Sequence, residues 1–206
     1  FIVVNDEDSN WESLYYLSGF RGTAGALLVY ADGSSDLILD NRYIEQGRSQ
    51  SPHEVIPQTS AADMEILSRL KLRGVSGNVL CEAGKTTYKT WQTLKSPLTN
   101  LVSGDDILKK LRRKKDAYEV SCIVRAGEIG AKAFLDTLDS VREGMTEKEF
   151  ESMLNYKINM LGGENGFDMV VASGERSSMP HGRATEKQMV RGEWTTVDFG
   201  ARYRGY

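Results

Sequence analysis

Few residues of this chain have the type and spacing that catalysis needs. They are its two histidines and one aspartate that lies in a strand-like segment. The 206 residues contain only His53 and His181. His181 lies between Pro180 and Gly182 in a polar loop, and Asp198 follows seventeen positions later inside an apolar segment. A carboxylate is a hard oxygen ligand for divalent cations, so this arrangement is compatible with metal-assisted chemistry.

The neighbours of Asp198 predict where its carboxylate points. Val197 and Phe199 flank it in a strand-like run, and side chains alternate between the two faces of a strand. The carboxylate should therefore lie on the face opposite these two apolar side chains. Two interpretations remain open from spacing alone: an ordinary salt bridge or turn hydrogen bond, or a metal ligand, because a buried carboxylate is costly unless paired or coordinated.

Several other catalytic motifs are excluded. Neither histidine has a second histidine four residues on, so the H-E-x-x-H zinc motif is absent. The sequence 84–86 resembles the end of a phosphate-binding loop, but Val79 stands where the motif needs its first glycine. A triad of Ser178, His181 and Asp198 lacks the G-x-S-x-G elbow of serine hydrolases, which leaves that interpretation with little support.

Composition excludes further classes of function. The net charge is -3, with 27% charged and 40% hydrophobic residues, and no apolar run approaches the roughly 20 residues of a membrane span. Residues 109–115 hold six basic side chains in seven positions, but acidic residues flank them and no aromatic residues alternate with them. We predict a solvated linker or helix end there rather than a nucleic-acid site. His53, after a Ser-Pro turn, is predicted to be a surface residue.

The two cysteines of the chain bear on its compartment. Cys81 and Cys122 lie far apart in the sequence and form no C-x-x-C pair. We therefore predict a reducing, cytoplasmic location without a disulfide.

The first 110 residues predict a layered α/β domain. The Asp32-Gly33 pair between two apolar runs predicts a β-hairpin, and a helix is expected to start at residues 60–63. Met64, Leu67 and Leu70 should lie on one face of that helix. Further strands are expected at residues 1–4, 26–30, 36–39, 55–56 and 79–81.

Residues 111–206 predict a second domain that begins with two helices. A helix over residues 116–141 is expected to bury a periodic set of apolar residues, and the capping-box sequence 146–149 predicts the start of a second helix. Strands are expected at 169–172 and 195–200 on either side of the His181 loop. The apolar residues of the first helix that recur at three- and four-residue steps are Val120, Ile123, Val124, Gly127, Phe134, Leu138 and Val141.

The two ends suggest that the polypeptide continues beyond the printed sequence. Phe1 begins what reads as a buried strand, and the last residues end in an incomplete hairpin. We therefore expect further residues at both ends.

The motifs around His181 and Asp198 resemble the creatinase/aminopeptidase P/prolidase family of "pita-bread" metallopeptidases. The resemblance rests on residues 171–174, 180–182, 197–200 and 205–206 in the second half of the chain, and on residues 14–20, 25–29, 39–43 and 111–120 before them. It implies an α/β creatinase-like N-terminal domain at 1–110 and part of an α+β pita-bread catalytic domain at 111–206.

The resemblance also implies roles for three residues. A complete member holds two divalent ions, usually Mn, Co or Zn, with two Asp, one His and two Glu. Asp198 matches the first Asp ligand, His181 matches the histidine that contacts the substrate carbonyl and steadies the tetrahedral intermediate, and Phe167 matches a position in the substrate pocket. Residues 20–23 resemble a loop that approaches the neighbouring active site in dimers, which implies a homodimer.

The resulting expectation is an Xaa-Pro dipeptidase or aminopeptidase P that acts on proline-containing peptides in the cytoplasm, with neither nucleic acid nor membrane as a partner. The other metal ligands should follow Tyr206, so these residues alone should not complete the two-metal site. Two alternatives are a non-catalytic binding module of the same fold and a creatinase-like amidohydrolase.

Overall fold

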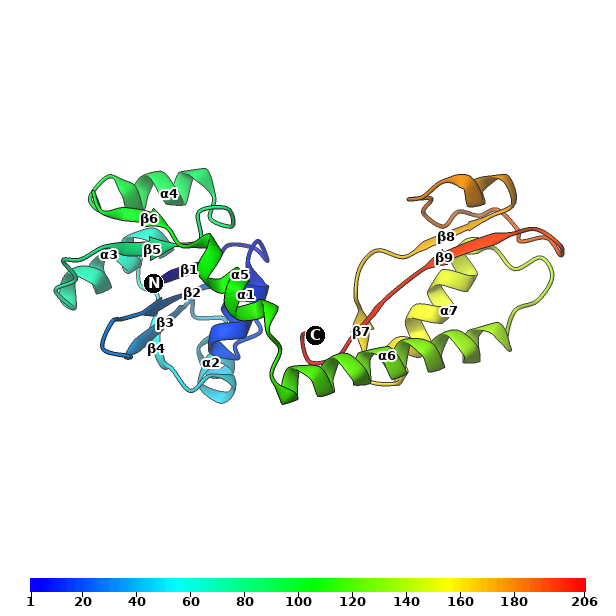
Figure 1. The fold of residues 1–206 in the computed structure, drawn as a ribbon, viewed down its shortest axis with the longest axis horizontal. Helices are drawn as coiled ribbons and strands as arrows, with labels where there is room; N and C mark the ends of the chain where they lie inside the picture. The colour runs from blue at the N-terminus through cyan, green and yellow to red at the C-terminus, as the bar shows by residue number, and fades with distance from the viewer. The chain divides into compact units, whose positions relative to one another are not determined.

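The computed structural model describes all 206 residues, which form two compact units, Phe1–Lys114 and Lys115–Tyr206 (Figure 1). Each unit combines helices with strands, so the predicted mixed α/β class is confirmed. None of the helices has the combination of length and apolar character that spanning a bilayer requires.

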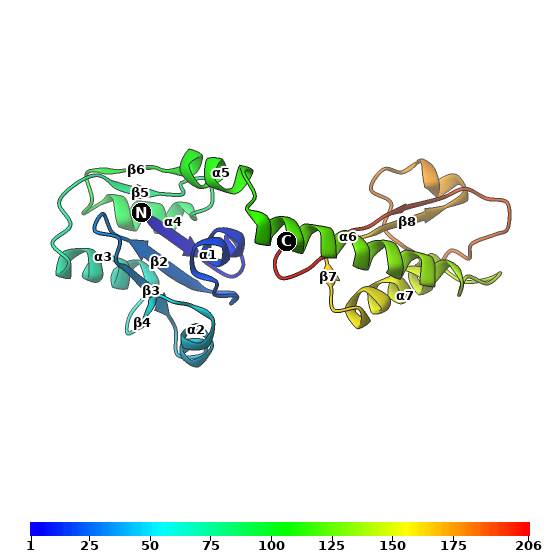
Figure 2. The ribbon, with the colours of Figure 1, turned by 60° about the horizontal axis from the view of Figure 1, so that its bottom comes forward.

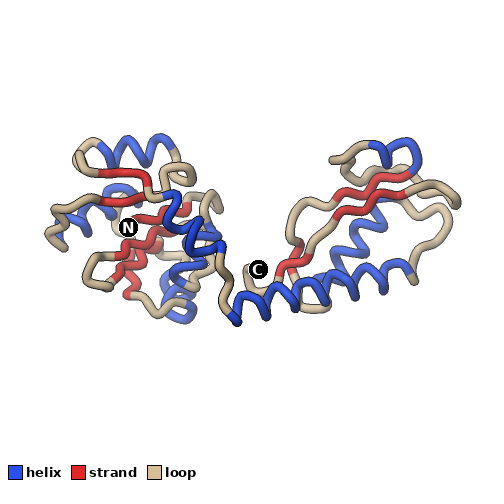
Figure 3. The backbone as a smooth tube through the Cα atoms, in the orientation of Figure 1, coloured by secondary structure: helices blue, strands red, loops and turns tan.

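A single six-stranded sheet organises the first unit (Figure 3). Its order is β4-β3-β2-β1-β5-β6; β2 pairs antiparallel with β1 and β3, and the other neighbouring strands pair in parallel. The strands are β1 (Ile2–Asn5), β2 (Gly25–Val29), β3 (Ser35–Leu39), β4 (Glu54–Pro57), β5 (Val79–Cys81) and β6 (Leu101–Ser103).

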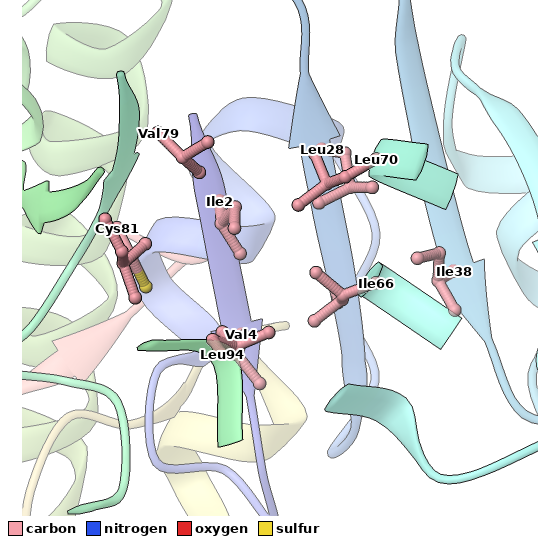
Figure 4. Packing of buried hydrophobic residues seen from close by; sticks show 11 residues of the cluster. Ile2, Val4, Leu28, Ile38, Ile66, Leu70, Val79, Cys81 and Leu94 are labelled. Atoms are coloured by element: carbon pink, nitrogen blue, oxygen red, sulfur yellow. The ribbon is translucent and has the colours of Figure 1, made fainter. Parts of the chain in front are cut away.

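Helices supply apolar side chains to both faces of this sheet. They are α1 (Trp11–Ser18), α2 (Ile44–Gln50), α3 (Ala62–Leu72), α4 (Tyr88–Lys95) and α5 (Asp105–Arg113). Ile2 and Val4 join a cluster with residues of α3 and α4 (Figure 4), whereas Val3 joins a second cluster with Leu14 of α1 and Leu108 of α5. This alternation along β1 gives the sheet a buried core on each side, as expected for a layered α/β domain.

The hairpin predicted at Asp32-Gly33 is confirmed. β2 and β3 pair antiparallel, with Val29 opposite Ser35. Gly33 has a φ of 85°, a conformation that strains residues with a Cβ, and Asp32 Oδ1 accepts a hydrogen bond of 2.9 Å from the backbone N–H of Ser34. The turn chemistry read from the sequence therefore sets the register of this strand pair.

The prediction of the apolar face of α3 is partly wrong. The helix begins close to the expected position, and Leu70 is buried as predicted. Met64, however, is 53% exposed, and Ile66 takes the central position against the sheet. Residues 64 and 66 lie on different sides of a helix, and the short apolar pattern did not distinguish them.

The second unit places two helices beside a narrow two-stranded ribbon. The predicted capping box is confirmed, because Thr146 Oγ1 accepts from the Glu149 N–H while Glu149 caps the Thr146 N–H. Figure 2 shows α6 and α7 side by side. The elements are α6 (Ala117–Leu138), α7 (Glu147–Met160), β7 (Glu164–Asn165), β8 (Val170–Ser173), a 3-10 turn η1 (Gly174–Ser178), β9 (Thr195–Asp198) and β10 (Ala201–Arg202).

The predicted buried face of α6 is wrong for most of its residues, although Phe134 packs against the core as predicted. Val120, Ile123 and Val124 are 44–55% exposed, and Leu138 is 46% exposed. The face that packs against α7 and the ribbon is built mainly from smaller side chains, namely Cys122, Ala126, Ile129, Gly130, Ala133 and Thr137. Small residues let backbones approach closely, so this face is buried although its side chains are less apolar than those of the exposed face.

The ribbon is irregular at its centre. β8 pairs with β9, and β7 pairs with β10, both antiparallel. Between these ladders, residues 166–169 on one side face only residues 199–200 on the other. Such a bulge locally bends and twists a strand pair, and bulges often lie next to active sites.

Candidate active site

Asp198 is the last residue of β9 and lies opposite Val170 of β8. Val197 and Phe199 pack against the core of the second unit, so the predicted alternation is confirmed. The Asp198 side chain is exposed and makes no hydrogen bond or ion pair within the chain. The Asp198 carboxylate therefore lies on the face opposite Val197 and Phe199, where it is exposed and unpaired.

The loop that carries His181 lies over the same face of the ribbon. Residues opposite each other on antiparallel strands point to the same side, so the side chains of Val170, Ala172, Thr196 and Asp198 share one face, which we call the loop-covered face. Thr196 Oγ1 donates to the carbonyl of Ser177, which places η1 on this face.

Gly182 brings the His181 segment against β8. A Cβ on Gly182 would lie 3.0 Å from the Cβ of Ala172. Ala172 lies two residues along β8 from Val170, the residue opposite Asp198, which is about 7 Å of strand. The structure therefore brings the His181 loop and Asp198 to one face of one short ribbon. His181 itself is exposed and has no hydrogen bond within the chain.

Phe167 lies in the bulge of the ribbon. Its ring packs against the backbone of Gly200, where an added Cβ would come within 2.7 Å of the ring. The neighbouring Gly166 donates its N–H to the Gly200 carbonyl at 2.8 Å. Phe167 is 47% exposed and thus presents an aromatic surface, and the Gly200 that its ring contacts lies two residues after Asp198 in the sequence.

His53 is not the surface residue that its turn composition predicted. Its ring is partly buried, with Nδ1 hydrogen-bonded to Ser35 Oγ at 2.5 Å and Nε2 to the Leu17 carbonyl at 2.9 Å. Both ring nitrogens are used to join β3 to α1 in the first unit. We assign it a structural role because its partners are a hydroxyl and a backbone carbonyl.

A buried carboxylate near the loop was not predicted. The side chain of Glu147, the first residue of α7, is fully buried. Burial alone would raise its pKa, but hydrogen bonds from Ser173 and Thr185 outweigh this effect and lower the pKa to about 2. Glu147 therefore carries its negative charge at any pH near neutrality.

The residues present do not form a metal site by themselves. No group of three or more His, Cys, Asp or Glu side chains is arranged to hold an ion. Asp198 offers one unpaired, exposed carboxylate, which fits a single position in a larger set of ligands but not a complete cage. The basic residues 109–115 form the exposed end of α5 and its continuation, as predicted.

Comparison with known families supports the resemblance along nearly the whole chain. Residues 1–114 match the Creatinase/Prolidase N-terminal domain, and residues 121–206 match Metallopeptidase family M24. The chain is 31% identical to the uncharacterized peptidase YqhT of Bacillus subtilis over 93% of its length, and 29% identical to the Xaa-Pro dipeptidase of Pyrococcus furiosus over 94%. It spans 55% of each of these relatives.

Solved structures agree with this result. The X-Pro aminopeptidase of Thermotoga maritima superposes with a TM-score of 0.91 at 32% identity, over 99% of this chain and 57% of that one. The prolidase of Pyrococcus furiosus gives a TM-score of 0.86 at 28% identity, over 98% and 61%. The fold predicted from the motifs, a creatinase-like domain followed by part of a pita-bread domain, is confirmed. The chain therefore belongs to the creatinase/prolidase family of metallopeptidases, with an N-terminal creatinase-type domain and part of a domain of family M24.

Proposed function

We propose that the complete protein hydrolyses peptide bonds between any residue and proline, with two divalent metal ions. The observation that carries this proposal is the position of the His181 loop and Asp198 on one face of the same ribbon. Relatives described as Xaa-Pro dipeptidases and aminopeptidases support the class of substrate.

Three side chains of this chain have distinct roles in the proposal. The His181 imidazole donates a hydrogen bond to the carbonyl oxygen of the scissile bond, where negative charge develops. The exposed ring of Phe167 packs against the substrate, because a proline amide has no N–H and must be recognised largely by its shape. The carboxylate of Asp198 is one metal ligand, and the described residues do not supply the rest of the set.

The metal contributes chemistry that protein side chains supply poorly. A divalent ion of the Mn, Co or Zn type polarises a carbonyl and makes a bound water acidic near neutral pH. Asp198 suits this use because its carboxylate is exposed and unpaired, so binding an ion breaks no existing interaction. The homodimer and the cytoplasmic location remain predictions.

Metal-dependent hydrolysis tests the proposal. The complete protein, stripped of metal, should release proline from Xaa-Pro dipeptides or cleave longer Xaa-Pro peptides only after Mn²⁺ or Co²⁺ is added. Peptides with alanine in place of proline are the control and should be cleaved far more slowly. If the metal-loaded protein cleaves none of these peptides, the proposal fails, and cleavage of creatine instead would favour the amidohydrolase alternative.

A further inference from the structure

Glu147 uses both of its oxygens to bind the two ends of the His181 loop. Oε1 accepts from Ser173, through the backbone N–H at 2.7 Å and the hydroxyl at 3.0 Å. Oε2 accepts from Thr185, through the backbone N–H at 3.0 Å and the hydroxyl at 2.8 Å. Ser173 ends β8 and Thr185 follows the loop, so one carboxylate closes residues 174–184 into a ring.

Arg176 extends this contact into the loop itself. Its Nε donates to Glu147 Oε2 at 3.2 Å, and its terminal nitrogen donates to the carbonyl of Arg183 at 2.7 Å. Arg183 lies two residues from His181. Hydrogen bonds therefore connect Glu147, at the start of α7, through the Arg176 guanidinium to the backbone of Arg183, close to His181.

The backbone at the start of α7 holds the far end of the loop independently. The N–H groups of Glu147 and Lys148 donate to the carbonyls of Lys187 and Thr185, at 3.0 and 3.1 Å. These are helix N-terminal donors that have no partner inside the helix, and their dipoles favour the negative charge of Glu147. Loss of the carboxylate would thus remove its hydrogen bonds to Ser173 and Arg176, while the N–H of Lys148 still binds the Thr185 carbonyl.

A direct chemical role for Glu147 conflicts with its surroundings. Its side chain is fully buried, and its two oxygens already accept five hydrogen bonds. A group in this state can neither reach a substrate nor bind a metal without dismantling the network. Its influence on chemistry must therefore pass through the loop.

We infer that Glu147 is a positioning residue, which fixes the loop carrying His181 by joining the loop's two ends and Arg176. The importance of this role for catalysis rests on the proposed function, whereas the positioning itself does not. Without the carboxylate, the loop gains conformations and the backbone that carries His181 loses its fixed position.

The two histidines of the chain allow a direct test by NMR. In the 206-residue chain, Glu147→Gln should shift and broaden the ring signals of His181 and lower hydrogen-exchange protection at residues 174–184 by about 10- to 100-fold, the loss expected for hydrogen bonds to a charged group. The ring signals of His53, in the first unit, should not move. Glu149→Gln is the matched control, because Glu149 lies in the same helical turn but contacts Thr146 and Arg142 instead of Ser173 and Thr185.

A second variant keeps the inference testable if Glu147→Gln fails to fold, which the methyl signals of the buried Leu154 and Val171 would reveal. Arg176→Ala leaves the Glu147 carboxylate four of its five hydrogen bonds and should still shift the His181 signals. A folded Glu147→Gln or Arg176→Ala protein with unchanged His181 signals and loop protection would overturn the inference.

Activity of the complete enzyme separates this inference from the proposed function. Glu147→Gln should lower kcat for Xaa-Pro hydrolysis by about 10- to 100-fold, the cost of a small misplacement of a catalytic group, with KM nearly unchanged. If the loop responds in NMR but the wild-type enzyme cleaves no Xaa-Pro peptide, only the proposed function fails. If the wild-type enzyme is active and Glu147→Gln is equally active, the importance of this positioning for catalysis is wrong, whatever the NMR signals show.

Discussion

Replacing His181 by alanine in the complete protein is expected to lower kcat for Xaa-Pro hydrolysis by about 10²–10³-fold, the usual cost of removing one donor to a developing oxyanion. The imidazole is exposed and uses neither ring nitrogen within the chain, so it is free to donate to a substrate. KM should change little, because the hydrogen bond strengthens mainly in the transition state. Steady-state kinetics of the metal-loaded protein on an Xaa-Pro dipeptide measures both quantities.

The other histidine provides the control for this substitution. His53→Gln alters a side chain that joins β3 to α1 through Ser35 and the Leu17 carbonyl. It should leave kcat and KM within about twofold of wild type, because both contacts of His53 lie within the first unit and the candidate site residues belong to the second. Full activity of His181→Ala would remove the assigned role of His181.

Replacing Asp36 by alanine is expected to destabilise the first unit by about 3 kcal/mol, the lower part of the range for breaking a buried ion pair. The Asp36 side chain is fully buried and accepts from Arg69 Nε at 2.9 Å, from a terminal nitrogen of Arg73 at 2.7 Å and from the Tyr30 hydroxyl at 2.7 Å. The variant leaves two guanidinium groups without their carboxylate. Urea unfolding followed by amide signals of β2 and β3 measures the loss.

The Asp36 carboxylate should also make the stability of the first unit depend on pH. Burial would raise the pKa of Asp36, but hydrogen bonds from Arg69, Tyr30 and Arg73 outweigh burial and hold the pKa below its ordinary value. The stabilisation is therefore complete above the ordinary aspartate pKa of about 3.9 and is lost as the pH falls through the lower, folded-state pKa. Wild type should lose this part of its stability in acid, and Asp36→Ala should not.

Asp40→Ala is the matched control for Asp36. Asp40 lies directly after β3, the strand that contains Asp36, and pairs with Arg42 at 2.8 Å, but the Arg42 side chain is 64% exposed. A pair of this kind contributes about 0–1 kcal/mol. If Asp36→Ala costs no more than Asp40→Ala at pH 7, the buried network does not stabilise the first unit.

Local sequence chemistry predicted the elements better than their packing. The Asp32-Gly33 hairpin and the Thr146 capping box follow from interactions between residues at most three positions apart, so the sequence alone contains the necessary information. The buried face of α6 does not follow from such local interactions. Its helix has two faces that can pack, and the choice of the face with Ala126 and Ala133 depends on how closely α7 and the ribbon approach.

The candidate site could likewise be predicted from the sequence only in part. Strand alternation correctly separated Asp198 from Val197, but whether Asp198 is covered depends on neighbours that alternation cannot supply. Glu147 was missed because an acidic residue in the first turn of a helix is fully explained by the helix dipole. Its partners Ser173 and Thr185 lie 26 and 38 positions away, and no pattern near residue 147 indicates them.

The metal content of the complete protein tests the central proposal most directly. Asn in place of Asp198 keeps the size of the side chain but removes the negative charge that a divalent ion requires. The wild-type protein, loaded with Mn²⁺ and dialysed, should retain two ions per chain, and Asp198→Asn should lose at least one of them together with Xaa-Pro hydrolysis. An Asp198→Asn protein that retains both ions and cleaves Xaa-Pro peptides at the wild-type rate would contradict the proposal.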